Sequence, residues 1–286
     1  MKSLIFSRFI AAAGSTLLLA LLAVSPASAA TNPLNQPRGL ALAANGNLYV
    51  ANQGGNNILV FNPNYVQVTS KTITAGIDKP SGIAIDSLGN IYVSNWTSGQ
   101  VSVYSSAAVQ NTSATLSGIN APQGIAVDGI GNIYVDEDYQ DVRIYSANVS
   151  PADSIPLLVG TYTPGLDVFG VATHNQFFAW GSVSQAYSET IDGTLVGDGV
   201  FPTEAPASTA LALAYDLKGN LYYCNTNGAV DYLNFSADSV VTFASLGFTC
   251  EGVVVDNARQ RVYMSNQQGN SIAVYSTSGT LLKTIE

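Results

Sequence analysis

One repeated position in this chain carries asparagine or glutamate, and both side chains can bind a polar ligand. The position closes a recurring phrase such as NLYVAN or NIYVSN, and its occupants are Asn52, Asn95, Glu137, Asn225 and Asn266. An amide offers a donor and an acceptor side by side, which suits sugars, peptides and polar small molecules. The alternative is that each asparagine caps the loop that follows it.

A second set of residues stands one position before a repeated glycine or its substitute. Its polar members are Arg38, Ser81, Gln123 and Glu251. If the copies form a ring, both sets line one mouth of a central channel, and Arg38 and Glu251 become neighbours that form an ion pair. We therefore predict a ligand site from nine residues: Arg38, Asn52, Ser81, Asn95, Gln123, Glu137, Asn225, Glu251 and Asn266.

The histidine count excludes several kinds of catalysis. His174 is the only histidine, whereas a Ser/His or Cys/His site needs a base beside its nucleophile and a His-rich zinc site needs several imidazoles. We assign no catalytic residue, no cofactor and no metal ligand. Asp136, Glu137, Asp138 and Asp141 form an acidic group that could hold Ca²⁺, but we expect a solvated acidic rim there.

The elements that position these residues follow from a repeat. Its anchors recur every 40 to 46 residues, a period that fits four short strands with their turns, which is one propeller blade. The anchors are Gly39, Gly82, Gly124, Gly170, Ala212 and Gly252. The sequence predicts an all-β fold, a six-bladed β-propeller with four antiparallel strands per blade, that occupies residues 30–286 as a single domain.

Other repeated residues have structural roles in this scheme. The aromatic in each second strand, such as Tyr49 or Tyr92, is expected in the core between blades, and Asp86 and its equivalents are expected to form turns. Leu34–Pro37 matches Ile77–Pro80, so the first and last blades should abut without sharing a sheet. This seam is expected to be the weakest point of the ring.

The two cysteines fall at equivalent ends of strands in adjacent blades. Cys250 begins a first strand, and Cys224 lies near the end of a second strand. Because export leads to an oxidising compartment, we predict a disulfide between the fifth and sixth blades. The alternative is two buried free thiols.

The N-terminal segment has the features of a signal peptide. Lys2 and Arg8 form a positively charged beginning, a largely apolar stretch follows from Phe9 to Val24, and Ala27-Ser28-Ala29 supplies small residues for cleavage. Residues 1–29 are therefore predicted to be removed, which places the protein in the periplasm or outside the cell with no integral membrane segment. An uncleaved membrane anchor is the alternative.

The charge balance is acidic, with a formal net charge of −9. The leader contributes two of the cations, so the remaining chain is more acidic still. A phosphate backbone would be repelled by this surface, which argues against nucleic acid as a partner.

The repeated phrase resembles the NHL repeat, and YVANQGGNNILVF and YVSNWTSGQVSVY are also similar to the YVTN-type repeat. This resemblance covers residues 33–286 and implies a six-bladed, TolB-like propeller, a fold that does not by itself imply a function. EGVVVD, which begins at Glu251, is similar to the strand that supplies a metal-binding glutamate in gluconolactonase-like propellers. The equivalent positions here include Arg38, Ser81 and Gln123, so that family's metal site is not expected.

The sequence favours a secreted, non-catalytic binding or scaffold module. Its partner would be a polar ligand, a glycan or an extracellular protein bound at the channel face. The alternative is a metal-dependent lactonase or gluconolactonase-like hydrolase. A streptogramin-lyase-like activity is disfavoured because those sites depend on histidine.

Overall fold

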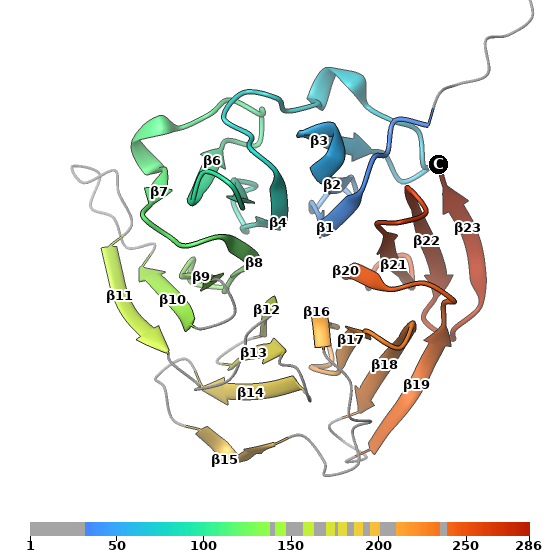
Figure 1. The fold of residues 1–286 in the computed structure, drawn as a ribbon. Helices are drawn as coiled ribbons and strands as arrows, with labels where there is room; N and C mark the ends of the chain where they lie inside the picture. Colours follow the sequence, from blue (N-terminus) through green and yellow to red (C-terminus); the bar gives the residue numbers. More distant parts are fainter. Residues whose placement is uncertain are drawn as a thin grey trace, which may run out of the picture. The chain divides into compact units, whose positions relative to one another are not determined.

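Each well-preserved copy of the repeated phrase folds into two antiparallel strands joined by a tight turn (Figure 1). The computed structural model describes residues 32–137, 141–146, 157–162, 170–174, 177–181, 186–190, 195–200, 210–234 and 239–286. The predicted leader lies outside these residues, and the compact unit begins at Asn32. Within the described ranges, no helix is both long and apolar enough to cross a membrane.

The described strands form six antiparallel sheets. The first holds β1 (Pro37–Leu42), β2 (Leu48–Asn52) and β3 (Asn57–Phe61). The second holds β4 (Pro80–Ile85), β5 (Ile91–Asn95), β6 (Gln100–Tyr104) and β7 (Leu116–Ser117). The third holds β8 (Pro122–Val127), β9 (Ile133–Glu137), β10 (Asp141–Ser146) and β11 (Leu157–Tyr162).

The remaining three sheets follow in chain order. The fourth holds β12 (Gly170–His174), β13 (Phe177–Gly181), β14 (Ala186–Thr190) and β15 (Leu195–Val200). The fifth holds β16 (Ala210–Tyr215), β17 (Leu221–Asn225), β18 (Ala229–Asn234) and β19 (Ser239–Ser245). The sixth holds β20 (Cys250–Asp256), β21 (Arg261–Asn266), β22 (Ser271–Ser276) and β23 (Leu281–Ile285). Three 3₁₀ helices are η1 (Gln53–Gly55), η2 (Thr69–Lys71) and η3 (Thr112–Ala114).

The prediction of an all-β, antiparallel propeller is confirmed. The predicted four strands in each of six blades are not all found. The described part has five complete four-stranded blades rather than six, and the sheet nearest the N-terminus has three strands. In that sheet the segment after β3 turns back and forms η2, so that only single bridges, Phe61 with Gln67 and Ile58 with Ile73, stand where a fourth strand would run.

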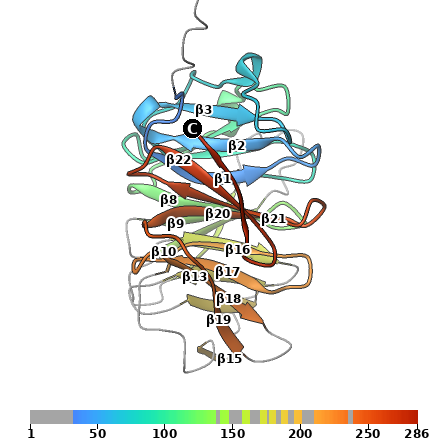
Figure 2. The ribbon, with the colours of Figure 1, turned by 90° about the vertical axis from the view of Figure 1, so that its right-hand side faces the viewer.

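The first strand of each sheet lies at the centre of a ring, and the later strands lie progressively outward (Figures 1 and 2). Close approach of the inner strands requires glycine. A methyl group on Gly82 would collide with the backbone carbonyl of Gln123, and one on Gly252 would collide with that of Arg38. The repeated glycine therefore allows neighbouring sheets to meet at the axis.

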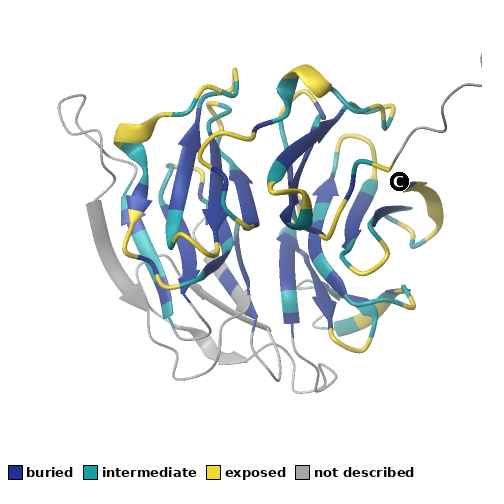
Figure 3. Cartoon of the chain, turned by 45° about the horizontal axis from the view of Figure 1, so that its top comes forward, coloured by how far each residue is buried: buried dark blue, intermediate teal, exposed yellow. Residues whose placement is uncertain are grey.

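The hydrophobic core lies between neighbouring sheets, and alternation along β4 shows how it forms. Ile83 packs into the cluster shared with the first sheet, whereas Ala84 packs into the cluster shared with the third. Tyr49 and Tyr92 are buried in these clusters, which confirms their predicted core role. The inner strands are accordingly buried throughout most of their length (Figure 3).

The repeated aspartate fixes the turn between first and second strands, as predicted. Asp86 Oδ1 accepts hydrogen bonds from the backbone N–H of Leu88 at 2.9 Å and of Asn90 at 2.7 Å. Asp86 Oδ2 accepts from Asn90 Nδ2 at 2.8 Å and from the hydroxyl of Tyr92 at 3.1 Å. Asp128 makes the same set of bonds in the third sheet.

The ring closes where the first sheet meets the sixth, and no sheet of described strands mixes strands from both ends of the chain. Leu34 and Ile285 are buried in one cluster with residues of both sheets. Asn32 Nδ2 donates to the backbone oxygen of Asn270 at 2.7 Å, and Asn270 Oδ1 accepts from the backbone N–H of Gln36 at 2.8 Å. The seam is therefore held by side chains.

Candidate functional site at the channel mouth

Four first strands place polar side chains around one mouth of the central channel. Arg38 is in β1, Ser81 in β4, Gln123 in β8 and Glu251 in β20, and each is the second residue of its strand. These four residues line the same narrow hollow together with Leu211 of β16. The structure therefore brings together the set that stands before the repeated glycine.

An ion pair crosses this mouth. Arg38 Nη2 lies 2.8 Å from Glu251 Oε2, which confirms the predicted pairing, and 3.5 Å from Gln123 Oε1. The two charged side chains keep 20% and 17% of their surface exposed. The guanidinium thus links three sheets while one side of the pair stays in contact with solvent.

The hollow behind the ion pair is too small for a drug-sized ligand. Its volume is about 70 Å³. Ligand pockets typically measure about 300–1,000 Å³, and one water occupies about 30 Å³ in the liquid. The hollow has room for ordered water but not for a drug-sized ligand, so a larger partner would contact the rim.

The asparagines that end the second strands lie further from the axis; Asn52, Asn95 and Asn225 are buried, and Asn266 is half-buried. Asn52 Oδ1 accepts from the backbone N–H of Asn35 at 2.6 Å, and Asn52 Nδ2 donates to Asn57 Oδ1 at 2.8 Å. Asn95 Oδ1 accepts from Asp78 N–H at 2.9 Å, and Asn95 Nδ2 donates to Ser102 Oγ at 2.9 Å. These contacts correspond to the loop-capping alternative.

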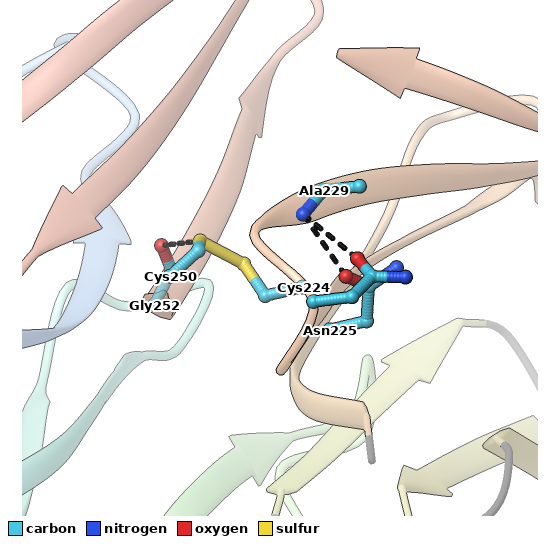
Figure 4. The surroundings of a disulfide bond; sticks show 6 residues. Cys224, Asn225, Ala229, Cys250 and Gly252 are labelled. Atoms are coloured by element: carbon cyan, nitrogen blue, oxygen red, sulfur yellow. Dashed lines mark hydrogen bonds between the residues drawn. A yellow bond between two sulfur atoms is a disulfide. The ribbon is translucent and has the colours of Figure 1, made fainter. Parts of the chain in front are cut away.

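The other members of this second set also bond within their own loops. Asn225 Oδ1 accepts from the backbone N–H of Ala229 at 3.0 Å (Figure 4), while Asn225 Nδ2 donates to Asp231 Oδ2 at 2.6 Å. Asn266 Oδ1 accepts from Gly269 N–H at 2.8 Å. Asn52 and Asn95 therefore fix the links that lead into their sheets, whereas Asn225 and Asn266 fix the loop between their second and third strands.

Glu137 makes the corresponding contacts with a charged partner. Its carboxylate accepts from Arg143 through both Nε and Nη2, and from the backbone N–H of Asn120 at 2.6 Å. Glu137 and Asp136 are buried, so the expectation of a solvated acidic rim is wrong for both. Asp138, the third member of that expected group, lies outside the described residues.

Asp136 is a buried carboxylate that sequence reasoning did not assign to the mouth. Its Oδ1 accepts from the backbone N–H groups of Gln123 and Gly124, both at 2.7 Å. Burial raises the pKa of Asp136 to about 7, against the opposing effects of these two bonds and of the Arg38 charge. In the described residues, Asp136 Oδ2 and Gln123 Nε2 are buried without a partner.

A sequence signal for Asp136 did exist. Aligned copies carry Ala51, Ser94, Cys224 and Ser265 at its position, so an aspartate there stands out against small residues. Trp96 was also missed. It follows Asn95 on the mouth side of the ring and leaves 45% of its surface exposed.

The donor set of the mouth does not fit a divalent cation. Glu251 is already bound by the guanidinium of Arg38, whose positive charge would repel a metal ion. The neighbouring ring positions add serine, glutamine and leucine rather than a second carboxylate. Among the described residues, no group of three or more His, Cys, Asp or Glu side chains is placed to hold a metal ion.

The predicted disulfide is present. Cys224 of β17 and Cys250 of β20 are bonded, with their Cα atoms 5.4 Å apart (Figure 4). Both cysteines are fully buried in the cluster between the fifth and sixth sheets. The bond lies on the mouth side of that interface because Cys250 begins its strand and pairs with Asn266.

Comparisons with known proteins support the propeller fold. A family model described as a beta-propeller repeat matches residues 69–100, a range that contains β4 and β5. No curated protein matches the sequence. The NHL type of the repeat therefore stays a prediction.

Solved structures similar to this chain have several activities. A gluconolactonase from Xanthomonas campestris gives a TM-score of 0.65 at 15% identity, covering 82% of this chain and 84% of that one. A virginiamycin B lyase from Staphylococcus aureus gives 0.61 at 12% identity, covering 87% and 83%. Kuenenia stuttgartiensis hydrazine synthase gives 0.64 at 15% identity, covering 85% and 77%. At these identities the similarity shows the fold alone.

Proposed function

We propose that this protein is an exported, non-catalytic propeller of the NHL type that binds a polar partner, a glycan or an extracellular protein, across the channel mouth. In this proposal residues 30–286 form one domain. The three-stranded first sheet counts as a blade and brings the closed ring to six. The leader directs the chain to the periplasm or the cell exterior, where the disulfide between Cys224 and Cys250 is stable.

The observation that carries the proposal is the shape and chemistry of the mouth. The hollow of about 70 Å³ at the mouth offers little room for a substrate, whereas its rim presents the partly exposed pair of Arg38 and Glu251. Trp96 adds an exposed aromatic side chain on the same side. Arginine and tryptophan are enriched at protein interfaces, so a flat partner that covers the rim fits better than a small molecule that is engulfed.

A photo-crosslinking experiment tests this face. A benzophenone amino acid in place of Trp96 should capture a defined partner in the envelope and medium of the producing cell. The matched control places the same group at Leu88, which is 82% exposed in the turn at the opposite edge of the second sheet. Adducts that form equally at both sites, or at neither, would contradict the proposal.

A metal-dependent lactonase is the second candidate, and two observations favour it: Glu251 lies at the mouth, and the fold is similar to that of a gluconolactonase. The pairing of Glu251 with Arg38 is the argument against it. A ligand that binds the native state raises the melting temperature by mass action. We expect no shift when Ca²⁺, Mg²⁺ or Zn²⁺ is added to EDTA-treated protein. A saturable rise that Glu251→Gln abolishes would favour the enzyme.

A further inference from the structure

A second and larger hollow lies between the fifth and sixth sheets, at the edge of the ring opposite the channel mouth. Its volume is about 400 Å³, within the range of about 300–1,000 Å³ that small-molecule sites occupy. The turn that begins at Asp216 and the turn around Thr277 both contribute to it. The side chains that line its two walls include Tyr222, Tyr232, Phe243, Asn257, Gln260 and Ser278.

One wall of this hollow is aromatic. The ring centroid of Tyr222 lies 4.8 Å from that of Tyr232 and 5.2 Å from that of Phe243. These rings pack on one another, so they leave no cage between them and instead form a continuous wall. Val241 lies beside them and is largely exposed.

Tyr232 is specific to this sheet. It pairs across the strands with the core tyrosine Tyr222, and the same register position in the first, second, third and sixth sheets carries an aliphatic residue. Those residues are Val60, Val103, Ile144 and Val274. The ring fold therefore does not require an aromatic side chain here.

The turn beneath the wall also differs from the turns of the second and third sheets in its contact with the core tyrosine. In the second and third sheets the turn aspartate accepts a hydrogen bond from the core tyrosine. Asp216 instead receives its bonds in the described structure from Lys218 and Asn220. Burial and the nearby Tyr232 and Asp216 raise the pKa of Tyr222, so its hydroxyl is neutral at physiological pH.

The opposite wall consists of amide and hydroxyl groups from the sixth sheet, held in place by their own contacts. Asn257 Oδ1 accepts from the backbone N–H of Leu217 at 3.1 Å, and Gln260 Nε2 donates to the backbone oxygen of Asn257 at 2.6 Å. Thr277 Oγ1 donates to Gln260 Oε1 at 3.2 Å. These bonds leave further donor and acceptor capacity on the amides and on Ser278.

The charges of the lining balance. Among the described residues that line it, Asp216 and Lys218 are the charged ones, and the oxygens of Asp216 are engaged by the turn. An ionic ligand would find no net counter-charge here. A wholly apolar ligand would cover the amides of Asn257 and Gln260 without pairing them, which is costly.

We propose that this hollow between the fifth and sixth sheets binds a neutral saccharide. A sugar ring presents C–H groups that can pack on the Tyr232 and Phe243 wall and hydroxyls that can bond the amides of Asn257 and Gln260. The site lies at the other edge of the ring from Arg38 and Glu251. It is therefore independent of the function proposed for the channel mouth.

Isothermal titration calorimetry of the mature protein with cellotetraose, maltotetraose and triacetylchitotriose tests this site. We expect saturable binding of at least one of them. Tyr232→Val, which restores the residue type of the other sheets, should weaken that binding by about tenfold or more. Ser278→Trp should block the hollow from an exposed turn, and it carries the test if Tyr232→Val does not fold.

Two matched control variants test whether binding is specific to this hollow, and two ionic ligands test whether it prefers a neutral molecule. Leu88→Trp places the same bulk on an exposed turn of the second sheet, and Glu251→Gln alters only the channel mouth, so both should bind like the wild type. The inference is overturned if no neutral saccharide binds, if Ser278→Trp binds normally, or if Glu251→Gln abolishes binding. Preferential binding of choline or of an oligogalacturonate would overturn the assignment to a neutral ligand.

Discussion

Asp136 shows how one residue can set the pH response of a propeller. It occupies a position where four of the other copies have small side chains, and it satisfies two inner-strand N–H groups with a single carboxyl oxygen. The other oxygen has no partner in the described residues. Burial therefore favours the protonated acid and raises its pKa to about 7.

The raised pKa predicts a loss of stability as pH increases. Below about pH 4 the group is protonated in both the folded and the unfolded chain. Between about pH 4 and 7 the unfolded chain releases this proton and the folded chain keeps it, so the free energy of unfolding falls, by up to about 4 kcal/mol. Above pH 7 this contribution is constant.

Asp136→Asn tests this, since the amide keeps the acceptor oxygen and cannot ionise. Guanidinium unfolding at several pH values should give similar stabilities for the two proteins near pH 4 and a more stable variant at pH 8. Comparing the variant with the wild type cancels the contribution of Asp231, whose pKa burial also raises. Parallel curves across the whole range would contradict the interpretation.

Asn95 should contribute to the stability of the fold, and the loss on its replacement can be compared with the loss at the more exposed Asn266. Asn95→Ala leaves the backbone N–H of Asp78 and the hydroxyl of Ser102 without the bonds at 2.9 Å that they now make. Leaving buried polar groups unpaired costs about 1–3 kcal/mol each. Asn266→Ala, at the equivalent but more exposed position, should cost clearly less in chemical denaturation. Equal losses would contradict this ranking.

At the scale of elements, the repeat predicted what depends on local pattern. The first two strands of most sheets were predicted from the glycine anchors, the turn aspartates and the core tyrosines. This succeeded because strand alternation and turn chemistry are encoded within one copy. The fourth strand was predicted less well. It is two residues long in β7 and is replaced by single bridges in the first sheet, since the segments that carry it lack a clear alternating pattern.

The candidate sites were likewise predicted only where a contact follows from the alignment of the copies. Alignment placed Arg38 beside Glu251 and Cys224 beside Cys250, because each pair follows from ring closure or blade adjacency. It left open whether the asparagines bind a ligand or cap loops, and the structure shows their side chains bonded to loops and links of their own sheets. The saccharide hollow was also missed, because its walls come from two different copies and depend on how those copies pack.

The disulfide should stabilise the interface of the fifth and sixth sheets. It links residues 26 positions apart, and removing a bond of this kind typically costs about 2–4 kcal/mol. A Cys224→Ala, Cys250→Ala double variant should lose stability of that size in guanidinium unfolding. Dithiothreitol should then destabilise the wild type but not the variant. Equal sensitivity of both proteins to the reductant would contradict a structural disulfide.

At the scale of the molecule, closure of the ring depends on packing between its first and last sheets. Ile285 is 4% exposed in the seam cluster, while Leu282 in the same strand is 51% exposed. Ile285→Ala should cost about 2–5 kcal/mol, and Leu282→Ala, its control, about 0.5 kcal/mol or less. Thermal or chemical unfolding measures both. A small loss for Ile285→Ala would mean that the seam contributes little.

Each sheet of the described ring is built from strands that are consecutive in the chain, and among these strands none is borrowed from the far end. Gene duplication or deletion of a single copy would therefore add or remove one whole sheet without orphaning a strand elsewhere. Propellers whose first and last strands interlock lack this freedom, because their terminal copies cannot change independently. The present architecture lets copy number and copy sequence diverge separately, and Tyr232 and Asp136 are examples of residues that differ from the other copies within a single copy.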